Sequence, residues 1–164
     1  MTRAQTIITA NKVVSNWGNW QTGNMPPAAF PLSKRRGRCL KFGTAIRWRL
    51  VQFEACGLKC RLVIGFNLPK ETYVATLAVE QDRDMSVLLS YEFHGTHPGW
   101  HIHGACGDVN GIPEGSLRGQ WQRRFPKPRG RHRRGVFGVS DDGTAFQVAD
   151  EFFQLHNEDG TLPL

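Results

Sequence analysis

The feature that most constrains the fold is a series of five short segments between residues 46 and 103, each rich in β-branched and aromatic residues. Apolar and polar positions partly alternate along these segments, which is typical of strands with one buried face. The connections between them are short and are polar or contain Gly or Pro, as in hairpins. The segments span 47–53, 61–66, 73–80, 86–94 and 100–103. They predict an antiparallel sheet of about five strands.

One helical pattern follows, from about residue 144 to about residue 156. Its apolar residues recur at the spacing of one helix face, and Asp and Thr residues near its start suit an N-cap. The face comprises Ala145, Val148, Ala149, Phe152 and Leu155. A length of 164 residues suits one domain. We therefore expect a single α+β domain over residues 39–164, with this helix packed on one face of the sheet and a long basic loop at 107–135. An irregular, basic arm at 1–38 precedes it.

The chain is strongly basic, with a formal net charge of +7 and a pI near 9.7. No Lys or Arg follows residue 135, whereas six acidic residues do. The stretch 118–134, which we call the basic tract, holds eight Lys and Arg residues and no acid, and aromatic rings are interleaved with them. Such a stretch suits contacts with phosphates and stacking on bases. The candidate nucleic-acid-binding residues are Arg118, Trp121, Arg123, Arg124, Lys127, Arg129, Arg131, Arg133 and Arg134. The alternative interpretation is a flexible, solvated loop.

The remaining composition indicates an ordinary globular protein. No apolar run approaches the roughly 18 residues that cross a bilayer, and the N-terminal residues hold no long apolar stretch. We therefore expect no membrane segment, no secretory signal and a cytoplasmic location. The four cysteines are too few and too scattered for a disulfide framework, so free thiols are expected.

Four of the six histidines fall within the ten residues 94–103. Histidine is the commonest side-chain metal ligand. Residues two apart on a strand share a face, so His101 and His103 point the same way, as do Glu92 and His94 on the preceding strand. Two imidazoles and a carboxylate suit Mn²⁺, Mg²⁺ or Zn²⁺. The predicted metal ligands are Glu92, His101 and His103, with His94 the next candidate. The alternative is a polar face whose histidines bind nothing.

The connection between these two strands sets their register. A turn with residues 98–99 at its corners places His94 opposite His103. In the same register Glu92 lies opposite Ala105. Both polar faces then coincide, whereas a slip of one residue would separate them.

The carboxylate Glu92 followed by Gly99-Trp100-His101-Ile102-His103 resembles the His-hydrophobe-His motif of the HUH endonucleases. The members most similar to it are plasmid rolling-circle replication initiators. The resemblance implies a metal that polarises a phosphodiester of single-stranded DNA and a helix-borne tyrosine that attacks it. Here the two tyrosines, Tyr73 and Tyr91, both precede the histidine pair, and the predicted helix carries phenylalanines instead. A phenyl ring has no nucleophilic oxygen, so covalent catalysis from this helix is excluded.

These observations favour a nucleic-acid-binding protein, with single-stranded DNA or RNA as partner. In the first interpretation it is a metal-dependent nuclease or phosphodiesterase that uses activated water, with His94 and His97 as acid–base candidates. In the second it is a non-catalytic, HUH-like binding subunit or regulator. In the third, paired histidines act as acid and base without metal. In the fourth, a structural zinc module presents the basic loop to a protein partner. Homo-oligomerisation stays open.

Overall fold

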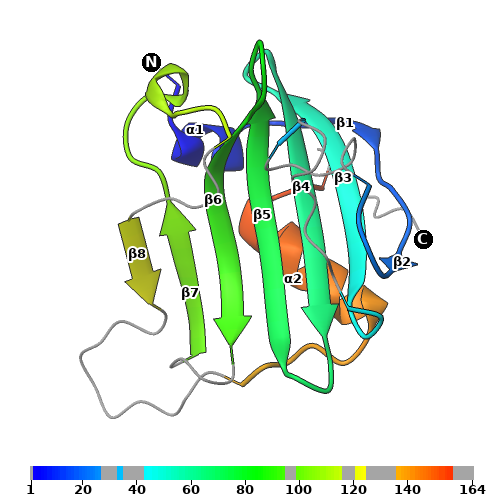
Figure 1. Ribbon diagram of the computed structural model, residues 1–164. Helices are drawn as coiled ribbons and strands as arrows, with labels where there is room; N and C mark the ends of the chain where they lie inside the picture. The colour runs from blue at the N-terminus through cyan, green and yellow to red at the C-terminus, as the bar shows by residue number, and fades with distance from the viewer. Residues whose placement is uncertain are drawn as a thin grey trace.

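A computed structural model describes residues 2–26, 33–34, 43–94, 99–115 and 136–156, and the backbone of 121–124 (Figure 1). The helices are α1 (Ala4–Thr9), the 3₁₀ turn η2 (Val109–Gly111) and α2 (Asp142–Phe153). The strands are β1 (Val13–Asn16), β2 (Gln21–Thr22), β3 (Arg47–Ala55), β4 (Leu58–Asn67), β5 (Thr72–Glu80), β6 (Met85–His94), β7 (Gly99–Gly104) and β8 (Trp121–Arg124). No helix in these described ranges is both long and apolar enough to cross a membrane.

The strands form one antiparallel sheet in the order β1-β3-β4-β5-β6-β7-β8, and β2 also pairs with β3. The predicted α+β class with an antiparallel sheet is confirmed. The five predicted segments correspond to β3–β7, and the count of about five strands was too low, because the described residues contain eight. The three additional strands are two to four residues long. Strands this short and polar give no alternating pattern to recognise.

The added strands fall where irregular structure was expected. The 1–38 segment contributes α1, β1 and β2, and the 107–135 segment contributes η2 and β8. In both places turn residues and charges surround a short strand that depends on pairing with a longer neighbour. Tertiary pairing, rather than local propensity, produces these strands.

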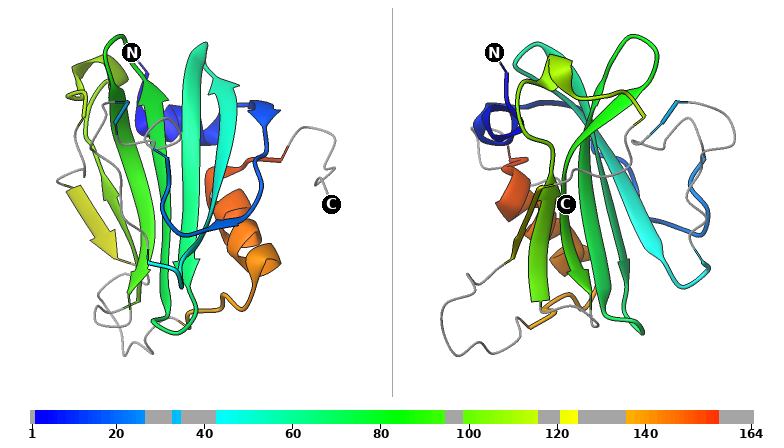
Figure 2. Two further views of the ribbon diagram at one scale, coloured as in Figure 1. Left: turned by 45° about the vertical axis from the view of Figure 1, so that its right-hand side comes forward. Right: turned by 60° about the vertical axis from the view of Figure 1, so that its left-hand side comes forward.

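The main core lies between the sheet and α2, with α1 on the same side (Figure 2). Strand alternation sends the apolar residues of β3–β7 to this face, where they surround the buried side of α2. The Tyr73 hydroxyl donates a 3.0 Å hydrogen bond to the Ala145 carbonyl. The Arg47 guanidinium pairs with the Asp142 carboxylate in the first turn of α2. These contacts fix the helix across one face of the sheet, as predicted.

Helix α2 begins with a capping box. The Asp141 carboxylate accepts from the Thr144 backbone N–H at 2.8 Å, and the Thr144 side chain bonds back to the Asp141 N–H. The helix ends at Phe153, because Gln154 adopts a left-handed conformation with φ of 53°. The predicted span of about 144–156 was therefore displaced by two to three residues at each end.

The opposite face of the sheet, which we call the open face, has a smaller apolar cluster. Trp48 is its largest member, and the Trp48 indole N–H donates to the Gly23 carbonyl at 2.9 Å. The other members are Met25, Leu50, Val63, Ala78, Met85 and Val87. On β6 this cluster ends at Val87, so the last part of β6 and the facing part of β7 present polar side chains here.

Candidate metal centre

The β6–β7 register differs from the predicted one. Glu92 pairs with His101, His94 pairs with Gly99, and Ser90 pairs with His103. The expected pairs, His94 with His103 and Glu92 with Ala105, were wrong, because β6 ends at His94 and β7 begins at Gly99. The connection is thus residues 95–98 rather than 98–99 alone.

This correction leaves the faces unchanged. The partner of each β6 residue moves by four positions along β7, an even number, so the same side chains stay on the open face. The change brings the carboxylate of Glu92 directly opposite the imidazole of His101. Directly opposite side chains in an antiparallel pair are close neighbours.

Three potential ligands converge at this point, near the arrowhead of β6 in Figure 1. The Glu92 Oε2 atom lies 2.9 Å from His94 Nε2 and 3.7 Å from His101 Nε2. One ligand atom from each of the three residues lies within 4.8 Å of the others. We call this group the Glu92 centre. A single cation of the size of Zn²⁺ or Mn²⁺ can contact all three after small side-chain movements.

The orientation of His101 suits metal binding. Its Nδ1 atom lies 3.1 Å from the Gly99 carbonyl oxygen, and since a carbonyl only accepts, Nδ1 carries the proton. In the neutral imidazole, Nε2 then presents a lone pair to the Glu92 side. A metal-binding histidine is usually held by this kind of hydrogen bond from its other ring nitrogen.

Burial makes the Glu92 centre asymmetric. Glu92 and His101 are 6% and 3% exposed, whereas the side chain of His94 is 34% exposed. A buried carboxylate is costly unless cations or donors compensate it, and two imidazoles surround this one. Access from solvent is therefore on the side of His94.

The histidines predicted as site residues differ in their relation to the Glu92 centre. His103 lies next to His101, with ring centroids 5.1 Å apart, but the group that can hold a metal consists of Glu92, His94 and His101 among the residues described. His94, predicted as the next candidate ligand and as an acid–base candidate, thus belongs to the group that can hold a metal. The predicted two-residue turn had placed His94 opposite His103, whereas His94 pairs with Gly99. His97 lies outside the described residues.

Most of the basic tract also lies outside the described residues. This applies to Arg118, Lys127, Arg129, Arg131, Arg133 and Arg134. The backbone of Trp121, Arg123 and Arg124 forms β8, the neighbour of β7. Arg124 pairs with His101, so part of the basic sequence runs beside the Glu92 centre.

Neither tyrosine belongs to the Glu92 centre. Tyr73 and Tyr91 pack with the core on the α2 face, and burial raises the pKa of Tyr73 well above its usual value. Helix α2 also lies on that face, away from Glu92 and His101. The helix-borne nucleophile implied by the HUH resemblance is therefore missing in residue type and in position.

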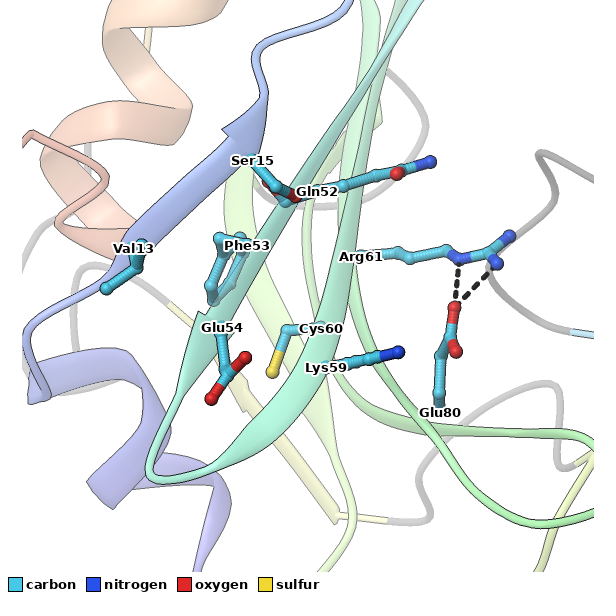
Figure 3. A pocket seen from close by; sticks show the side chains of 9 residues that line it. All are labelled: Val13, Ser15, Gln52, Phe53, Glu54, Lys59, Cys60, Arg61 and Glu80. Carbon is cyan, nitrogen blue, oxygen red and sulfur yellow. Dashed lines mark hydrogen bonds and ion pairs between the residues drawn. The ribbon is translucent and has the colours of Figure 1, made fainter.

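A separate pocket of about 400 Å³ lies near β1 and the far end of β3–β4 (Figure 3). Its side chains diverge: Gln52 and Arg61 extend to one side of the strands, whereas Val13 and Phe53 lie on the other. Arg61 is already paired with Glu80, with Nη2 2.6 Å from Oε1. This arrangement offers no convergent ligand set.

Comparison of the chain with protein-family models, curated proteins and solved structures found no match. The HUH resemblance therefore depends on the residues quoted above, and the functional argument depends on the geometry of the Glu92 centre.

Proposed function

We propose that the protein is a metal-dependent phosphodiesterase acting on single-stranded nucleic acid, with Glu92, His94 and His101 as ligands of a divalent cation. The observation that carries the proposal is the approach of two imidazoles and one buried carboxylate to within 4.8 Å of one another. This assignment replaces the His103 ligand by His94 and retains Glu92 and His101.

The donor set narrows the choice of metal. Imidazole nitrogens suit Zn²⁺ and other late divalent metals, whereas sites for Mg²⁺ are built mainly from oxygens. Mn²⁺ accepts both kinds of donor. Three protein ligands leave coordination positions for water and a phosphate oxygen, which is the pattern of catalytic rather than structural zinc sites. Zn²⁺ and Mn²⁺ are therefore the preferred ions.

The chemistry follows from this donor set and from the missing nucleophile. A bound divalent ion supplies Lewis acidity and lowers the pKa of coordinated water. No tyrosine reaches the centre, so water is the nucleophile and no covalent protein–DNA product forms. His103, beside His101 on the same face of β7, is suited to exchange protons with the reacting phosphate.

The basic tract supplies the affinity for substrate. Neutralising phosphates with Lys and Arg is the main source of affinity for nucleic acid. The β8 part of the tract is hydrogen-bonded to β7, the strand that carries His101. A nucleic-acid backbone held along β8 therefore runs beside the strand that carries His101.

The 2.9 Å contact between Glu92 and His94 favours one other function, a metal-free nuclease. A carboxylate that holds an imidazole can orient it as a general base, as in catalytic dyads. In that case the same residues are needed, but chelation has no effect on cleavage.

The test combines metal analysis with cleavage of single-stranded DNA and RNA oligonucleotides, with and without EDTA. The proposal predicts about one bound ion, cleavage that EDTA abolishes, and loss of both metal and cleavage in His101→Ala and in the double variant His101→Ala/His103→Ala, whose fold stays intact by circular dichroism. EDTA-resistant cleavage would support the metal-free enzyme. Cooperative unfolding in EDTA would indicate structural zinc. Binding without cleavage under all metals would support a non-catalytic subunit.

A further inference from the structure

A second hollow, of about 430 Å³, lies on the α2 face, opposite the Glu92 centre. It is formed where β6, β7 and α2 meet the chain that follows the basic tract. The residues that matter here are Tyr91, Trp100, Val136, Phe137, Glu151 and Phe152. We call it the aromatic hollow. Val136, at its mouth, is 84% exposed, which is unusual for a large apolar side chain.

A continuous stack of rings forms one wall of the aromatic hollow. Trp100 stacks on Tyr91 with ring centroids 4.7 Å apart and planes at 29°. Tyr91 stacks in turn on Phe152 at 4.1 Å and 12°. All three rings are half-buried, so each retains surface toward the hollow. A planar aromatic ligand can extend such a stack, and any nucleobase has the required π-face.

The charges around the hollow favour a base over a phosphate. Glu151 is exposed at the rim, and its carboxylate repels phosphate but accepts hydrogen bonds from N–H groups on the edges of bases. Burial, together with the charge of Glu151, raises the pKa of Tyr91 to about 12. The Tyr91 hydroxyl is therefore a neutral polar group at physiological pH.

The described chain resumes at Val136, two residues after the basic tract, and Val136 lines this hollow. The Trp100 indole N–H donates to the Val136 carbonyl at 3.1 Å, which anchors the chain two residues after Arg134. The eight cations of the stretch 118–134 thus precede, in the sequence, an aromatic surface whose lining includes the acid Glu151. This charge pattern is complementary to a single strand whose phosphates contact the tract while one base turns toward the rings.

We propose that the aromatic hollow binds one nucleobase of the single-stranded nucleic acid. The proposal rests on the nucleic-acid partner of the proposed function and adds a base-binding subsite on the other face of the sheet. Trp100 and His101 are consecutive on β7, so the two sites are reached from the two sides of the same strand. A strand that passes around the end of β6 and β7 contacts both.

The test measures binding of a short dye-labelled, single-stranded oligonucleotide by fluorescence anisotropy, in EDTA so that cleavage cannot interfere. The comparison ligand is an abasic backbone of the same length. Loss of one stacked base weakens binding roughly 5- to 150-fold. Bases can also stack on Trp121 and Phe125 of the tract, so Val136→Glu identifies the hollow. We expect the preference of this variant for the base-containing ligand to be smaller than that of the wild type by the contribution of one stacked base.

Val13→Glu is the matched control. Val13 is 73% exposed and lies on β1, at the far edge of the sheet, so it introduces the same charge away from the hollow. We expect it to retain the wild-type preference. The high exposure of Val136 means that its replacement leaves the fold intact, which circular dichroism verifies. A 2-aminopurine base in the oligonucleotide gives a second readout, because stacking quenches its fluorescence in the wild type and not in Val136→Glu.

An unchanged base preference in Val136→Glu, or equal binding of both ligands by the wild type, would overturn the inference; a hydrophobic peptide as the true occupant gives this result. The two proposals fail separately. Metal-dependent cleavage with no effect of Val136→Glu leaves the proposed function standing alone. Base-dependent binding that Val136→Glu weakens, without cleavage under any metal, leaves the aromatic hollow standing alone.

Discussion

Replacement of His94 by Ala is the sharpest test of the Glu92 centre. His94 is the most exposed of the three ligands, so its loss removes a donor without opening a cavity in the core. The hydrogen bond to Glu92, 2.9 Å long, is lost in the metal-free protein, together with the approach of the His94 ring to that of His101. A bond of this kind contributes about 1 kcal/mol, which corresponds to about 2–4 °C in Tm for a domain of this size. The metal-free variant therefore stays folded.

The effect on metal binding is much larger. Mutation of a residue that merely supports a ligand costs 10–100-fold in affinity, so loss of a ligand costs on the order of 100-fold or more. Metal at 100 times the wild-type Kd stabilises the wild type by about 2.7 kcal/mol, or about 5–11 °C. The same metal concentration then equals about one Kd of the variant, and the stabilisation falls to about 0.4 kcal/mol, or about 1–2 °C.

The assay is thermal unfolding by differential scanning fluorimetry across a titration of Zn²⁺ and of Mn²⁺. His156→Ala is the control, because His156 is also an exposed histidine near one carboxylate, with its Nδ1 3.6 Å from Asp150 Oδ1. It lies just beyond the end of α2, outside the Glu92 centre. We expect His156→Ala to retain the full metal-induced rise. A full rise in His94→Ala, or loss of the rise in both variants, would refute the assignment of the centre.

Three further predictions concern the basic tract, α2 and the core. If about six cations of the tract contact phosphates, log K falls against log[salt] with a slope of roughly −4 to −5. The double variant Arg123→Ala/Arg124→Ala should weaken binding about equally across sequences. Anisotropy titrations measure both effects, and a flat salt dependence would contradict the prediction. Asp141 has a lowered pKa because Thr144 donates to it, so its stabilisation of α2 is present above about pH 4 and is lost as the pH falls through the folded-state pKa. Asp141→Ala should therefore have a lower Tm than the wild type at pH 7, and the gap should close in acid. Burial raises the pKa of Cys60 to about 12, so iodoacetamide at pH 8 should leave Cys60 unmodified in the folded protein, as read by mass spectrometry.

The sequence predicts the centre of the sheet well because β3–β7 are long enough for alternation to show. It predicts the faces of β6 and β7 for the same reason, because alternation fixes the direction of each side chain. The predicted and observed pairings differ by an even number of positions, so the same side chains share the open face in both. The sequence does not predict which residues of β6 and β7 pair with one another. These pairs depend on where each strand ends, and neither Pro98 nor Gly99 determines whether the turn is centred on them or ends at them.

The candidate metal ligands are the part of the site that the sequence predicts incompletely. A pattern of His101 and His103 on one strand suggests that both bind the same ion, because they share a face. In three dimensions the register places the carboxylate of Glu92 directly opposite His101 on the neighbouring strand, with His94 beside Glu92. Which side chains of β6 and β7 come together depends on the register between the two strands. That register depends on the length of the connection between them, which the local sequence pattern does not define.

Packing on the core face of β6 and β7 fixes the positions of the side chains on their open face. Ile102 is 6% exposed in the core, and full burial of such a side chain contributes about 1.5–3 kcal/mol. A slip of β7 by one residue would expose Ile102 and Trp100 and push His101 into the core, at a total cost comparable with much of the 5–15 kcal/mol that holds a typical domain together. The stack of Trp100, Tyr91 and Phe152 therefore keeps His101 opposite Glu92, even though no ring of that stack touches the open face. Changes to the aromatic hollow that disturb this stack should weaken metal binding as well as base binding. Val136 lines the hollow but is not part of the stack, so its replacement should weaken base binding alone.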